Sequence, residues 1–194
     1  MEKKAVVLML VLTVIISCVS LLVLPTKQTV LGQQTTTATN FLPYENSTYG
    51  IKAQYPSNWD KQENGTRQDT EIDLVTFYPP STNSNASLDI SIDDISDEKG
   101  TTLAQYAGNG MTDLNQSLKS FKLDGSSTNS VLAGLPAYNS TYTYVDGNVV
   151  LKDMEIGAIK GNNVYIVTYE AGINEYNKYL SVIQRVIDSL QITK

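Results

Sequence analysis

The sequence predicts an α+β domain in which helices cover an antiparallel sheet. Several stretches alternate apolar and polar residues with the period of two that half-buried strands show. Two other stretches place apolar residues at helical spacing, one in the middle and one at the end of the chain. Strands, a helix, three more strands and a closing helix in this order are typical of the α+β class.

The only tryptophan follows the first predicted strand. The run "IKAQY" at 51–55 alternates, and Pro56 suits the second position of a type I turn that leads to Trp59. On this pattern alone, Trp59 is either a binding platform or a plug in the wall of the fold.

Polar loops and strands alternate in the next part of the chain. Residues 60–70 read as a polar loop, 71–78 as a strand ended by Pro79-Pro80, and 86–95 as a strand. The polar face of this last strand is expected to carry Asp89, Ser91 and Asp93.

A helix is expected over 101–118, where the apolar period changes from two to that of a helix. Thr101 or Thr102 would be its N-cap. Gly108 and Gly110 weaken the helical pattern.

Three strands and a helix are expected to complete the domain. A connection over 121–130 leads to strands at 131–145, 149–160 and 164–172, and glycine-bearing turns separate these strands as in an antiparallel meander. The closing helix covers 173–192, with Asn174 as its expected N-cap.

The N-terminal part does not resemble a globular domain. Residues 1–25 place an uncharged apolar run behind a short basic start, as a signal peptide or membrane anchor does. Retention as an anchor, cleavage after Gly32 and lipidation of Cys18 are all open. The Thr/Gln-rich residues 26–40 are a linker, and 41–194 form one domain. We therefore expect export, to the outer face of the cytoplasmic membrane or into the medium.

Charge and composition exclude several classes of function. The chain has 14 basic and 20 acidic residues; residues 1–32 hold three and one of these, so the remainder has a net charge of −8. So acidic a surface argues against nucleic-acid binding. The sequence has no histidine, which excludes Ser-His-Asp and Cys-His nucleophiles and His-ligated metals.

Five motifs follow one another between residues 41 and 193. They are "YENSTYGIKAQYPSNW", "LAQYAGNGMTDL", "LAGLPAYNSTYTY", "NNVYIVTYEAG" and "YNKYLSVIQRVIDSLQI". In this order they resemble the opening hairpin, helix, two strands and closing helix of PsbP-like domains. The resemblance implies that Trp59 sits at the end of an edge hairpin and closes the core rather than forming a binding platform. That family is grouped with Mog1 in one α/β/α sandwich superfamily, and this chain looks like a non-photosynthetic prokaryotic, exported member.

The resemblance implies binding or assembly rather than catalysis. The named plant member is an extrinsic lumenal subunit of photosystem II that helps to retain calcium and chloride, and cyanobacterial relatives are often lipoproteins. No enzyme activity defines the family, and Mog1 binds a small GTPase. The basic residues and histidines linked to photosystem binding have no counterpart in this acidic, histidine-free chain.

Acidic residues are densest from the strand at 86–95 into the loop that follows it. Several carboxylates on one loop could supply part of the six to eight oxygen ligands that calcium takes, although the spacing does not match an EF-hand. The alternative is a solvated acidic connection that complements the first turn of the next helix. The candidate calcium ligands are Asp89, Asp93, Asp94, Asp97 and Glu98.

Other acidic and aromatic residues share strand faces. Asp153 and Glu155 alternate onto one polar face, as in a half-solvated sheet, and no acidic pair lies in a hydrolase signature. Tyr138, Tyr142 and Tyr144 also share a face, which is either the core side of the strand or an exposed aromatic strip.

Five N-x-S/T sequons mark candidate glycosylation sites in an exported domain. Asn64 and Asn85 are the best placed of them, because both are expected in loops. The five sites are Asn46, Asn64, Asn85, Asn115 and Asn139.

These observations favour a non-catalytic binding or assembly module that docks on an extracytoplasmic protein and associates with the membrane through its N-terminal segment. The alternative is a calcium-binding extrinsic subunit of a membrane complex. A histidine-free carboxylate hydrolase is a third reading.

Overall fold

Ten strands and two helices occur in the residues that a computed structural model describes, 40–81 and 84–194. These residues belong to one compact unit of the chain. In chain order the elements are β1 (Phe41–Asn46), β2 (Ile51–Pro56), β3 (Asp60–Gln68), β4 (Glu71–Tyr78), β5 (Ser87–Asp94), α1 (Leu103–Ser117), β6 (Lys122–Leu132), β7 (Leu135–Asp146), β8 (Val149–Lys160), β9 (Asn163–Gly172), α2 (Tyr176–Ser189) and β10 (Gln191–Ile192).

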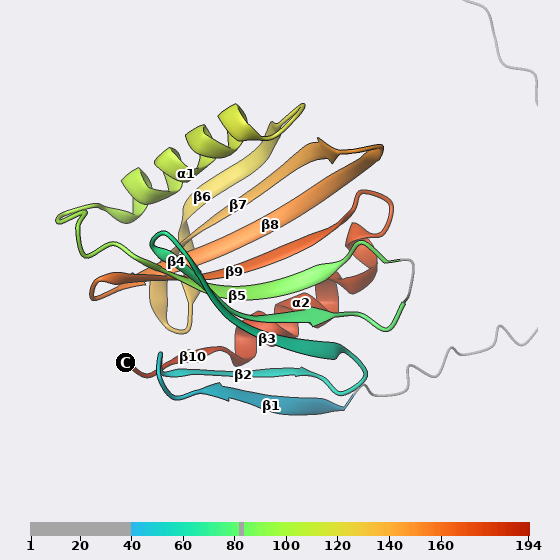
Figure 1. The fold of residues 1–194 in the computed structure, drawn as a ribbon, viewed down its shortest axis with the longest axis horizontal. Coiled ribbons are helices and arrows are strands. Elements are labelled where there is room, and N and C mark those ends of the chain that lie inside the picture. Colours follow the sequence, from blue (N-terminus) through green and yellow to red (C-terminus); the bar gives the residue numbers. More distant parts are fainter. Residues whose placement is uncertain (1–39, 82–83) are drawn as a thin grey trace, which may run out of the picture. The chain divides into compact units, whose positions relative to one another are not determined.

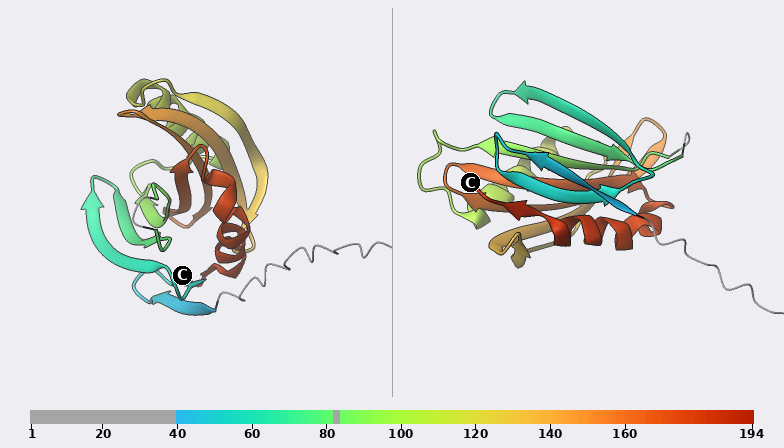
Figure 2. Two further views of the ribbon diagram at one scale, coloured as in Figure 1. Left: turned by 90° about the vertical axis from the view of Figure 1, so that its right-hand side faces the viewer. Right: turned by 90° about the horizontal axis from the view of Figure 1, so that it is seen from below.

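The strands form two antiparallel sheets, which confirms the predicted α+β class (Figure 1). The larger sheet has the order β3-β4-β5-β9-β8-β7-β6, and the smaller sheet has the order β1-β2-β10. Strands β5 and β9, which are far apart in the sequence, are neighbours at the centre of the larger sheet. The left view of Figure 2 shows the strands curling around α2.

The two edge strands of the larger sheet correct the sequence prediction. Residues 60–70 were expected to be a loop but contain β3, and most of the expected connection over 121–130 belongs to β6. Both edge strands carry bulges, where they hold one more residue than their partner. The bulges lie between Glu63 and Thr66 in β3, and between Leu123 and Gly125 and between Ser127 and Ser130 in β6.

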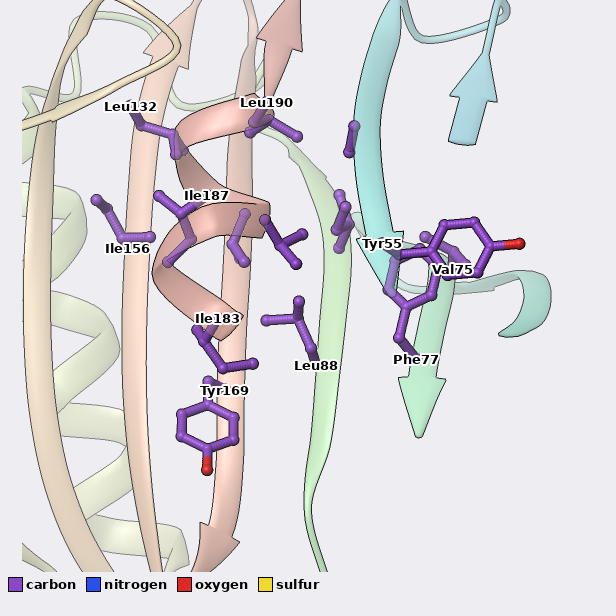
Figure 3. Close-up of a cluster of buried hydrophobic side chains, with 14 of the residues drawn as sticks. Tyr55, Val75, Phe77, Leu88, Leu132, Ile156, Tyr169, Ile183, Ile187 and Leu190 are labelled. Atoms are coloured by element: carbon purple, nitrogen blue, oxygen red, sulfur yellow. The ribbon is translucent and has the colours of Figure 1, made fainter. Parts of the chain in front are cut away.

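The main core lies between one face of the larger sheet and α2 (Figure 3). Alternate residues of neighbouring strands enter it, and Phe77, Leu88 and Tyr169 are completely buried. The apolar stripe of α2 supplies Ile183 and Ile187 to the same core. Each such side chain contributes about 1.5–3 kcal/mol through its burial.

Trp59 closes this core, as the sequence predicts. Its side chain is 6% exposed and packs edge-to-face on Tyr179 of α2, with ring centroids 5.5 Å apart. Its backbone N–H donates to the carbonyl of Pro56 at 3.0 Å, so a turn forms here as predicted, but Pro56 is its first residue and not its second.

The N-cap of α1 is one of the two predicted residues, whereas the N-cap of α2 differs from the prediction. Thr102 is the N-cap of α1 and forms a capping box with Gln105. The N-cap of α2 is Glu175 instead of Asn174, and its side chain makes no capping bond. This helix also ends earlier than predicted, because Gln191 and Ile192 leave it to pair with β2.

None of the helices within 40–81 and 84–194 is long and apolar enough to cross a membrane. The predicted anchor within residues 1–25, Cys18 and almost all of the predicted linker lie outside the described residues.

Candidate functional site: an acidic, tyrosine-lined sheet face

The face of the larger sheet opposite the main core carries acids and tyrosines. Because successive strand residues point to opposite faces, the alternation that buries apolar residues against α2 sends these polar residues the other way. Helix α1 contacts β6 and β7 at one end of this face (Figure 1). We call it the acid–tyrosine face, and it comprises Glu71, Asp73, Asp89, Asp93, Asp153, Glu155, Glu170, Tyr138, Tyr142 and Tyr144.

Five of the seven acids of this face are hydrogen-bonded by neutral hydroxyl groups, and none by a basic side chain. Among the described residues, none of the seven carboxylates takes part in a salt bridge. Their hydroxyl donors are Thr76 and Ser87 for Asp89 (2.6 and 3.0 Å), Ser91 for Glu71 (2.8 Å), Tyr106 for Asp93 (2.8 Å), Tyr138 for Glu155 (2.5 Å) and Tyr144 for Glu170.

Two fully buried oxygen atoms on this face lack any donor among the described residues. Oδ1 of Asp93 and Oδ1 of Asp153 are buried and have no hydrogen-bond partner in the described part of the chain. Asp153 is only 5% exposed and lies directly across from Tyr142 in the β7–β8 pair. A buried acceptor without a donor is costly, and a carboxylate more so.

Burial without a basic partner raises the pKa of several of these acids. It raises the pKa of Asp153 to about 8, with repulsion from Glu170 as the second cause. Burial also raises the pKa of Glu71 and Glu155, while hydrogen bonds from Ser91 and Tyr138 act in the opposite direction. The pKa values of Asp89 and Glu170 are raised for the same reason.

A cavity of about 250 Å³ opens between α1 and this face. We call it the α1 cavity. Glu71 and Glu155 line it from the sheet, and Asp113 lines it from the helix. The remaining lining residues are Tyr106, Ala107, Gly110, Leu114, Ser117, Ile166 and Thr168.

The structure does not gather the five predicted calcium ligands into one ligand set. Asp89 and Asp93 lie on the acid–tyrosine face, whereas Asp94 accepts the backbone N–H of Ser96 and lies 3.8 Å from Arg67. Asp97 and Glu98 are exposed in the loop before α1. In the part of the chain that the structure describes, no three Asp, Glu, His or Cys side chains are placed to hold one metal ion. Calcium binding stays a prediction from the sequence.

The structure decides between the two readings of the tyrosine row and corrects the expected half-solvated face. Tyr138 and Tyr142 are buried and Tyr144 is half-buried, so the row is not an exposed strip, although it lies on the face opposite the main core. Asp153 and Glu155 share a face, as predicted, but Asp153 is buried instead of solvated. Sequence reasoning missed the joint face because the acids of different strands are seen to share one face only once β5, β9 and β8 are known to be neighbours.

The five sequons differ in their surroundings. Asn64 lies in β3 instead of a loop, and its amide donates to Thr76 at 2.9 Å. Asn85 and Asn115 are exposed, while Asn46 and Asn139 are half-buried in strands β1 and β7. Glycosylation at these sites stays a prediction.

Solved structures share this fold. Cyanobacterial PsbP (CyanoP) from Synechocystis is 15% identical, with 82% of this chain and 96% of that chain covered and a TM-score of 0.61. LpqN of Mycobacterium tuberculosis, described as involved in cell envelope biogenesis, is 15% identical over 81% and 92%, with a TM-score of 0.56. The Saccharomyces cerevisiae Ran-binding protein Mog1p is 11% identical over 80% and 96%, with a TM-score of 0.52.

The sequence itself matches a family model over nearly its whole length. No curated protein matches it. The model described as PsbP-like protein matches residues 5–192. Together with the Mog1/PsbP-like arrangement of an antiparallel sheet and two helices, this match establishes the relationship that the five motifs predict. The chain therefore belongs to the PsbP-like family.

Proposed function

We propose that this PsbP-like chain is an exported, non-catalytic binding module that docks on an extracytoplasmic protein, with α1 and the accessible acids of the acid–tyrosine face as its docking surface. The observation that carries this proposal is that the six acids of this face other than Asp153 have no basic partner in the described residues. Asp153 is left out because its raised pKa keeps it protonated at neutral pH. A surface with one sign of charge is complementary to a basic surface and speeds association with it.

The same geometry favours binding over hydrolysis. A general acid needs a raised pKa and also a hydrogen-bonding distance to the substrate. Asp153, whose pKa is raised to about 8, has almost no access from outside, so it cannot reach a substrate bond. The tyrosines that bond Glu155 and Glu170 hold these acids in place as structural acceptors.

Site-specific cross-linking of the full-length protein in its native membrane tests the proposal. A photoreactive residue at Gln116 on α1 lies three residues after Asp113, beside the α1 cavity. The matched control position is Gln184, which is exposed on α2. We expect a heavier adduct containing a second protein from position 116 and none from position 184. Adducts with this chain alone, or equal adducts from both positions, would contradict the proposal.

A further inference from the structure

The α1 cavity has the size of a single side chain. Its volume of about 250 Å³ is below the roughly 300–1,000 Å³ of sites that enclose whole drug-sized ligands. It is bounded by a helix on one side and a sheet on the other, so a chain segment lying across its mouth can insert one residue between them.

The lining combines an apolar part with an acidic part. Ala107, Leu114 and Ile166 are apolar, and Glu71 and Glu155 enter from β4 and β8. Lysine and arginine have the matching form, because an apolar stem carries a charged end group. Tyr106 adds an aromatic ring, which attracts a guanidinium or ammonium group near its face.

Each of the two glutamates has one carboxylate oxygen that accepts no hydrogen bond from the described residues. Ser91 donates to Oε1 of Glu71, and Tyr138 donates to Oε1 of Glu155. No described residue donates to the Oε2 atom of either glutamate. The orphaned Oδ1 atoms of Asp93 and Asp153 show the same shortage of donors elsewhere on this face. A donor that enters the cavity can therefore bond the Oε2 atoms of Glu71 and Glu155.

We propose that the α1 cavity receives a lysine or arginine side chain of the protein partner, whose charged group pairs with Glu71 and Glu155. This inference rests on the proposed docking function and names the chemistry that the partner must present. The partner contributes a basic residue from an exposed segment, and the hydroxyl-bonded glutamates hold fixed positions for it.

Gly110 provides a test that leaves the charge unchanged. It lines the cavity, and an added Cβ at this position would meet no atom within 4 Å. Gly110→Leu therefore adds an apolar side chain to the cavity lining without a clash of its Cβ, and we expect this side chain to occupy part of the cavity. Gly108 has the same freedom but does not line the cavity, so Gly108→Leu is the matched control. Both substitutions replace a helical glycine with a better helix former, so both variants should melt at a higher temperature.

The probe is a fluorescent tetra-arginine peptide, with tetracitrulline as its uncharged analogue. Binding to the full-length protein in detergent is followed by fluorescence anisotropy at physiological salt, where long-range attraction is screened. We expect equal affinity for the wild type and Gly108→Leu, an affinity at least about tenfold weaker for Gly110→Leu, and no binding of tetracitrulline. Equal binding to Gly110→Leu and Gly108→Leu, or equal binding of the two peptides, would overturn the inference.

Cross-linking from Gln116 in the native membrane separates this inference from the docking function. Loss of the adduct in Gly110→Leu and its retention in Gly108→Leu would support both. An adduct that persists in Gly110→Leu would overturn the inference and leave the docking function standing. No adduct in any variant, including the wild type, would overturn the docking function, and with it the assignment of the basic group to a protein partner.

Discussion

The ring of Tyr138 lies against the backbone of Gly157, its partner across the β7–β8 pair. A Cβ added at Gly157 would be 2.5 Å from Cε1 of Tyr138, closer than such atoms approach in proteins. Because residue 157 is a glycine, there is room beside it for the completely buried ring of Tyr138, whose hydroxyl donates to Glu155. The contact fixes one wall of the acid–tyrosine face.

Gly157→Ala should destabilise the protein by about 1–3 kcal/mol, because Tyr138 has to shift inside a packed interior. Urea unfolding of the variant measures this loss. Gly172→Ala is the control, since a Cβ at that position meets no atom within 4 Å. A loss of the same size in both variants would mean that the Tyr138 contact is not the cause.

Asp153→Asn should flatten the dependence of stability on pH. Asp153 has a pKa of about 8 in the folded protein and about 3.9 in an unfolded chain. Between these values the unfolded chain has lost a proton that the folded protein keeps, so stability falls as pH rises. The fall is at most about 1.4 kcal/mol per pH unit.

The asparagine variant has no such proton, so it should be more stable than the wild type by a margin that grows from about pH 4 to pH 8. Urea unfolding across this range provides the measurement. Asp60→Asn, at an exposed position of β3, should follow the wild-type curve. Parallel curves for Asp153→Asn and the wild type would show that Asp153 is ionised in the folded state at neutral pH.

Trp59→Ala should cost about 3–5 kcal/mol, because it removes a buried ring and its edge-to-face contact with Tyr179. Thermal unfolding measures the loss, and Trp59→Phe should recover part of it. The adduct formed from Gln116 should persist at temperatures where the variant is folded. An unchanged melting temperature with a lost adduct would instead make Trp59 a binding residue.

Calcium at the loop after β5, predicted from the sequence, should stabilise the protein by mass action. We expect millimolar calcium to raise the melting temperature of the wild type more than millimolar magnesium does. The increase should disappear in the double variant Asp97→Asn, Glu98→Gln. If calcium leaves the wild type unchanged, these acids form a solvated connection to α1 instead.

The predictable part of the fold is the part with one buried face. Strand β5 and helix α2 carry strong periodicities because each packs against the same core. The two strands that sequence reasoning missed, β3 and β6, are the two edges of the larger sheet. Almost every residue of β6 is exposed, so no apolar alternation marks it as a strand.

The candidate site was less predictable than the fold for a related reason. Asp89, Asp153 and Glu170 belong to three strands, and their common face depends on the pairing of β5 with β9 and of β9 with β8. Local alternation assigns each residue to a face of its own strand only. The alternation also led us to expect that solvent covers the polar face, because a strand's own pattern does not show where α1 lies.

The bulged edges have a consequence for how this protein can recognise another. An incoming strand needs an unbroken row of backbone N–H and C=O groups, and extra residues in β3 and β6 interrupt that row on both sides of the larger sheet. Extension of the sheet by a foreign strand is thereby disfavoured. Specificity is left to side chains, so a relative with another binding preference can arise by exchanging a few residues while the backbone stays the same.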